Sequence, residues 1–166
     1  MQSIISISID APPARVLELA GDIERWPSLL PHYLKVTVQS RVAERVVAQM
    51  VAVRQFGPLP VPVTWRAEQW ADASDDQDLR LHFRHVRGVT RGMQVTWHIR
   101  PDGPGAQVTI EHDFRRPLPL LGSELLPRFV NRFFVRPIAG RTLTTFKALA
   151  EERDSNEGGG SGGSGR

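Results

Sequence analysis

The chain has 166 residues, of which 40% are hydrophobic and 23% charged, with a net charge of +3 and no cysteine. This length predicts one domain with a sizeable core, and the lack of cysteine excludes disulfides and thiol chemistry. No apolar run is long enough to span a bilayer, no signal-peptide pattern opens the chain and no nucleic-acid recognition motif is present, so we expect a soluble, cytoplasmic protein without a nucleic-acid partner.

The N-terminal part predicts one strand followed by two short helices. Ile5, Ile7 and Ile9 alternate with serines, which is typical of a strand with one buried face. The next segment, 10–21, begins with an aspartate and two prolines and ends at a glycine, which predicts a short helix. A second short helix is expected around Trp26.

The middle of the chain is a run of strands. Period-two patterns cover 34–38, 44–56, 63–71, 79–86, 93–100 and 107–114. The prolines of segment 57–62 predict that this connection lies at a sheet edge or a bulge. A strand, two short helices, antiparallel strands and a last helix together predict an α+β fold in which a curved sheet wraps one helix.

The last apolar stretch, Glu124 to Arg153, predicts a long helix. Its apolar face changes phase at Pro137, so we expect the helix to bend there and bury both halves. The residues after it are rich in Gly and Ser, as in flexible linkers. We therefore predict a single domain over 1–153 and a flexible tail over 154–166.

Several segments resemble one superfamily, the polyketide cyclase/dehydrase and START-like (SRPBCC) proteins. The resemblance rests on Ile9-Asp10-Ala11-Pro12, Asp22 to Pro27, Leu30 to Tyr33, Gly92-Met93, Thr96-Trp97, Val108 to Phe114 and Arg141 to Lys147. It covers nearly everything before the tail. It implies a helix-grip fold, in which a seven-stranded antiparallel sheet holds the C-terminal helix around an apolar cavity.

Strand alternation selects the residues expected to line that cavity, because alternate side chains share one face. Apolar residues on these faces bring a few polar ones with them, which is the usual composition of a small-molecule site. The candidate ligand-binding residues are Tyr33, Trp65, Gln69, Phe83, His85, Trp97, His112, Phe129 and Phe133.

Two functions that use the cavity are compatible with these residues, and a third interpretation is an interaction module whose cavity is too small to use. The first is binding, transport or presentation of a hydrophobic small molecule, lipid or isoprenoid-like. The second is a cyclase/aromatase or dehydrase reaction. For the cyclase or dehydrase reaction, the resemblance to tetracenomycin-type aromatase/cyclases implies that Tyr33 is the acid–base group. The pocket histidines and Gln69 would orient the substrate. Gln69 stands where that subgroup has a pocket arginine. No metal motif or cofactor motif is present, so we expect neither.

Arg128, Arg132 and Arg136 recur every fourth residue on the polar side of the terminal helix. Such a stripe is usually a solvated face. It also predicts a possible peripheral contact with an anionic membrane at the cavity mouth.

Overall fold

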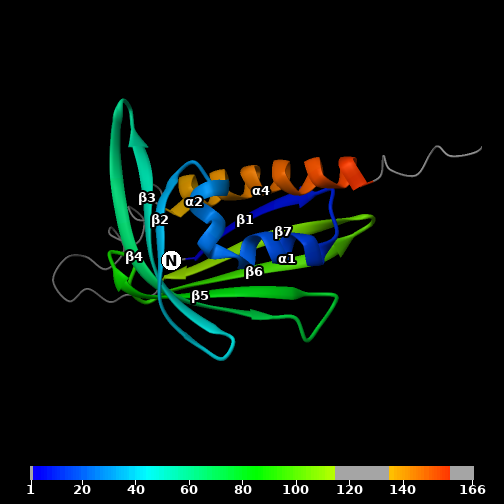
Figure 1. Ribbon diagram of the computed structural model, residues 1–166, viewed down its shortest axis with the longest axis horizontal. Helices are drawn as coiled ribbons and strands as arrows, with labels where there is room; N and C mark the ends of the chain where they lie inside the picture. Colours follow the sequence, from blue (N-terminus) through cyan, green and yellow to red (C-terminus); the bar gives the residue numbers. More distant parts are fainter. Residues whose placement is uncertain (1, 115–134, 158–166) are drawn as a thin grey trace, which may run out of the picture.

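The computed structural model describes residues 2–114 and 135–157, which form a seven-stranded antiparallel sheet curved around one long helix (Figure 1). The strands are β1 (Gln2–Ile9), β2 (Tyr33–Val42), β3 (Arg45–Phe56), β4 (Leu59–Asp72), β5 (Leu79–Gly88), β6 (Met93–Asp102) and β7 (Gly105–Phe114). The helices are α1 (Pro13–Gly21), the 3-10 turn η1 (Ile23–Arg25), α2 (Trp26–Leu29) and α4 (Arg136–Glu157). The strand order β1-β7-β6-β5-β4-β3-β2 confirms the predicted α+β, helix-grip fold.

The inner face of the sheet carries the core. Along β5 and β6 buried residues alternate with more exposed ones, as the period-two pattern predicts. The short helices bring Trp26 onto this face, where its ring centroid lies 4.9 Å from that of Tyr33, 5.7 Å from Phe83 and 5.9 Å from Phe146. This aromatic cluster joins α2, the sheet and α4.

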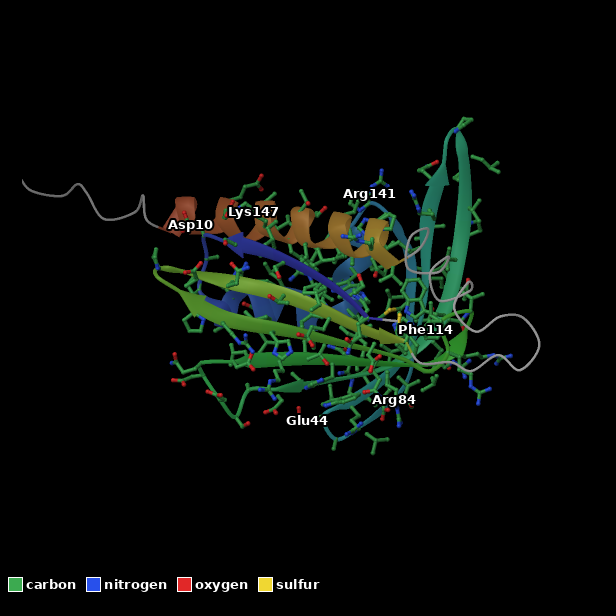
Figure 2. All side chains as sticks on the ribbon, turned by 180° about the vertical axis from the view of Figure 1, so that it is seen from behind. Asp10, Glu44, Arg84, Phe114, Arg141 and Lys147 are labelled. Carbon is green, nitrogen blue, oxygen red and sulfur yellow. The ribbon has the colours of Figure 1, made fainter. Side chains whose placement is uncertain are left out.

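The C-terminal half of α4 is fastened to β1 by a polar contact. Lys147 Nζ donates to the carbonyl of Ser8 at 2.8 Å and to Glu151 Oε1 at 2.5 Å. The same carboxylate oxygen accepts the backbone N–H of Asp10 at 2.8 Å. Figure 2 shows Asp10 and Lys147 together at this end of the helix. These bonds fix where α4 crosses the sheet.

The structure covers only part of the predicted terminal helix. Residues 124–134 and the predicted bend lie outside the described residues, while Pro137 occupies the first turn of α4, where proline is tolerated. The helix ends at Glu157, beyond the boundary predicted at Arg153. No helix in the described part of the chain is long and apolar enough to cross a membrane.

The β3–β4 hairpin extends well beyond the rest of the sheet (Figure 1). Pro60 and Pro62 lie within β4, opposite Gln55 and Val53 of β3. The Val53 N–H points away from β4 and donates to the carbonyl of His32. Val53 and Pro62 therefore form a non-hydrogen-bonded pair between β3 and β4. The prolines therefore remove no bond to β3. The nitrogen atoms of both prolines face the other edge of β4. That edge has no partner strand at Pro60 and Pro62, because β5 pairs with β4 only from Trp65 onward. This matches the predicted edge position.

The face of the sheet turned away from α4 carries paired charges. The carboxylate of Asp78 accepts bonds from Arg80 and Arg100 and contacts His98 Nδ1 at 3.1 Å. Burial alone would raise the pKa of Asp78, but these hydrogen bonds hold it at about 2. The opposite face of the sheet is apolar and carries the core.

Candidate functional site

A cavity of about 80 Å³ lies between the inner face of the sheet and the beginning of α4. Six strands, β2 to β7, contribute to its wall, and Val135, Ile138, Ala139 and Thr142 close it from the helix side. These four positions are spaced as one face of a helix, so a single face of α4 covers the cavity. The wall is mainly aromatic and aliphatic.

Six of the residues expected at the site from sequence lie together in this wall. They are Tyr33, Trp65, Phe83, His85, Trp97 and His112. The strand register explains this grouping, because Phe83 pairs with Val95 and Val95 with His112, so the inward residues of β5, β6 and β7 are neighbours. Whether these residues contact a ligand stays a prediction.

Gln69 is placed differently from the expectation. It lies on the inner face of β4, as its parity predicts, but farther along the strand and away from the cavity. Its amide Nε2 donates to the carbonyl of Gly21 at the end of α1, at 2.9 Å. The side chain thus satisfies a helix-terminal carbonyl instead of lining the cavity. Phe129 and Phe133 lie outside the described residues.

Other wall residues were not among the sequence candidates. They are Trp26, Met50, Val63, Thr90, Met93, Val95, Ile110, Val135, Ile138, Ala139 and Thr142. Met50 follows the inward alternation of Val46 and Ala48, which could have identified it. Thr90 belongs to the β5–β6 connection, whose conformation no periodicity predicts.

His85 is held by two contacts. Its Nδ1 lies 2.7 Å from the hydroxyl of Thr90, and its ring stacks on Trp65 with an interplanar angle of 6°. Burial, with a smaller effect of nearby His112, lowers the pKa of His85 to about 3. Burial likewise lowers the pKa of His112 to about 4, against an opposing hydrogen bond to the Ser3 backbone. Both imidazoles are therefore neutral at physiological pH.

Tyr33 lies beside a buried polar cluster at the base of α4. The hydroxyl of Thr142 donates to the carbonyl of Ile138 at 2.9 Å and contacts His32 Nε2 at 3.0 Å. Burial raises the pKa of Tyr33 well above its ordinary value, and a hydrogen bond with Thr142 opposes this only partly. The phenol thus stays protonated and is a poor proton donor.

The buried histidines predict acid sensitivity. Because the pKa of His85 and of His112 is lowered on folding, the unfolded chain binds more protons between about pH 4 and pH 6.5. The free energy of unfolding should therefore fall as pH drops from 6.5, by up to about 1.4 kcal/mol per pH unit for each histidine.

Urea unfolding at pH 7, 6 and 5 measures this slope. Asp78 does not interfere, since its stabilisation is lost only as pH falls from about 3.8 toward 2. His112→Phe should reduce the slope. Equal stability at pH 5 and pH 7 would contradict the prediction.

Comparison with known proteins identifies the group to which this fold and cavity belong. The family model described as "Polyketide cyclase / dehydrase and lipid transport" matches residues 5–151. The chain belongs to this family. The match spans β1 to α4, so it includes every described residue of the cavity wall and agrees with the resemblance seen in the sequence.

One relative and two solved structures illustrate what this chain is similar to. The actinorhodin polyketide synthase bifunctional cyclase/dehydratase of Streptomyces coelicolor is 28% identical over 92% of this chain, which spans 45% of that protein. The Zhui aromatase/cyclase of a Streptomyces species superposes with a TM-score of 0.74 at 17% identity, over 92% of this chain and 94% of its own. A STAR-related lipid transfer protein of Xanthomonas axonopodis superposes with a TM-score of 0.65 at 14% identity. The superposition covers 90% of this chain and 85% of that protein's chain. Both structures are similar in fold alone.

Proposed function

We propose that the protein binds a hydrophobic small molecule, lipid or isoprenoid-like, in the cavity beneath α4 and carries or presents it. The observation that carries this proposal is the cavity itself, a mainly apolar space that is lined by six strands, α2 and the beginning of α4. Burial of apolar ligand surface would provide most of the affinity, at about 25 cal/mol per Å². Membership of a family with lipid transport in its description supports the same function.

The size of the cavity indicates how a ligand would lie. Small-molecule pockets usually measure about 300–1,000 Å³, and the enclosed space here is about 80 Å³. The total empty space of the pocket, which includes open solvent, is about 640 Å³. A ring or short chain would fill the enclosed part, and the rest of a longer ligand would extend toward the opening.

A polyketide cyclase, aromatase or dehydrase activity is the second candidate. The observation that favours it is the Streptomyces coelicolor relative, named as a cyclase/dehydratase. In this chain, His85 and His112 would be the proton-accepting groups, although their lowered pKa values make them weak bases. The position of Gln69 and the raised pKa of Tyr33 weaken the roles expected for those two residues.

The test of ligand binding is to identify what the purified protein retains. Native mass spectrometry of protein prepared without detergent should show a bound mass, which organic extraction then identifies. A homogeneous apolar molecule in a fixed ratio supports the proposal. An empty protein that also fails to bind naphthalene by isothermal titration calorimetry would reject it.

Tyr33→Phe separates the two candidate functions. The Tyr33 hydroxyl forms its hydrogen bond with Thr142 of the same chain and not with a ligand. We therefore expect less than about a threefold change in naphthalene affinity. We also expect a loss of about 1 kcal/mol of stability from the missing hydrogen bond. Calorimetry and urea unfolding measure these quantities. If a turnover assay with an extracted ligand shows activity that the variant lacks, Tyr33 is an acid–base group after all.

We also propose that the protein acts in the cytoplasm, without nucleic acid, and touches anionic membranes through Arg136 together with Arg128 and Arg132. Arg136 is exposed at the start of α4, near the cavity, whereas the other two lie outside the described residues. Cosedimentation with vesicles containing phosphatidylserine at low salt tests this contact, and Arg136→Glu should weaken it. No cosedimentation at low salt would reject it.

A further inference from the structure

Two imidazoles face the mainly apolar cavity from neighbouring parts of the sheet. His85 lies on β5 and His112 on β7, and both side chains are buried, with 8% and 6% of their surface exposed. They lie on either side of β6, close enough that a charge on His112 would oppose a charge on His85. The cavity wall therefore contains one polar spot formed by two rings.

His112 has unused hydrogen-bonding capacity. Its Nδ1 is buried and has no well-formed hydrogen bond to any described residue. The Ser3 backbone opposes the lowering of the pKa of His112, as a carbonyl facing the ring N–H would. A neutral imidazole has one N–H and one lone pair. With the N–H directed to Ser3, the other nitrogen carries a lone pair and is an acceptor.

His85 can supply the complementary donor. The hydroxyl of Thr90, 2.7 Å from Nδ1, donates to that nitrogen when it rotates toward it. The proton of His85 then resides on Nε2, the nitrogen without a partner among the described residues. The pair of rings thus offers one donor and one acceptor.

A hydroxyl group is both a donor and an acceptor, so one hydroxyl can satisfy both rings. It would accept from His85 and donate to His112, which would complete a chain of hydrogen bonds from Thr90 to Ser3. An ether or ketone oxygen can only accept, and a hydrocarbon can do neither. We propose that the cavity selects ligands that carry a hydroxyl group, bound between His85 and His112. This specificity rests on the proposed binding function.

Trp26 Nε1 is also buried without a hydrogen-bond partner among the described residues. The rings of Tyr33, Phe83, Trp97 and Phe146 surround the indole, with centroids within 6.5 Å. We therefore assign Trp26 to the core and not to ligand selection.

The test compares three probes with the same ring system by isothermal titration calorimetry with the full chain: 2-naphthol, 2-methoxynaphthalene and naphthalene. We expect 2-naphthol to bind at least about tenfold more tightly than the other two, because only it can donate to His112. In His112→Phe this preference should fall below about twofold. Thr90→Val, which removes the hydroxyl that orients His85, should reduce the preference partly.

His82→Phe is the matched control, because His82 lies on the outer face of β5, where its ring stacks on Trp70. This variant should keep the full preference for 2-naphthol. Equal binding of the three probes by the unchanged protein would overturn the hydroxyl proposal and leave apolar binding intact. A preference that survives His112→Phe would also overturn it. If none of the probes binds, both proposals fail. The comparison of probes on the unchanged protein needs no variant to fold.

Discussion

Ala139→Phe should strongly weaken ligand uptake while the protein stays folded. Ala139 lies on the face of α4 that closes the cavity, and its side chain is 8% exposed. A phenyl ring at this position would occupy the enclosed space of about 80 Å³. A ligand would have to displace that ring or strain the wall, at about 1–3 kcal/mol, so the affinity should fall by roughly ten- to a hundredfold.

The matched control is Ala148→Phe, which adds the same ring on the exposed side of the same helix. It should leave naphthalene binding and the mass of any retained ligand unchanged. Filling an existing void does not require the core to expand, so urea unfolding should show at most a small change for Ala139→Phe. Full binding by a folded Ala139→Phe protein would mean that ligands bind elsewhere.

Phe146→Ala should be the most destabilising single substitution considered for this chain. Phe146 is 1% exposed, and its ring centroid lies 5.9 Å from that of Trp26 and 6.1 Å from that of Trp97. Removing the ring leaves a hole where α2, β6 and α4 meet. Substitutions of this kind cost about 3–5 kcal/mol, which is a large part of the stability of an ordinary domain.

Urea unfolding measures this loss, and Thr144→Ala on the exposed face of α4 is the control. The control should change stability by less than about 0.5 kcal/mol. A loss below about 1.5 kcal/mol for Phe146→Ala would show that α4 does not depend on the aromatic cluster for its position over the cavity.

The fold was predictable from sequence because its strands have one buried face. Alternation correctly placed Phe83, Trp97 and His112 on the inner side of the sheet, since a one-residue shift would expose every apolar side chain. The resemblance then supplied the connectivity and the position of the last helix, which local patterns alone do not determine.

The site was less predictable, for two physical reasons. The alternation of side chains along a strand shows which face a residue occupies, but not how far along the strand the cavity extends. Gln69 was therefore expected in the cavity wall, whereas its amide donates to the carbonyl of Gly21. Contacts that depend on tertiary structure leave no periodic signal. Thr90 reaches His85 only because the β5–β6 connection folds back, with the Gly92 N–H donating to the His85 carbonyl.

The two prolines of β4 also affect how molecules of this protein meet one another. A long projecting hairpin with an unpaired border invites strands from neighbouring chains, which is a common beginning of aggregation. Along that border Pro60 and Pro62 offer no N–H groups, and their rings obstruct close approach. Replacing both with residues that can donate should therefore make the protein more prone to self-association, even though the bonds between β3 and β4 stay the same.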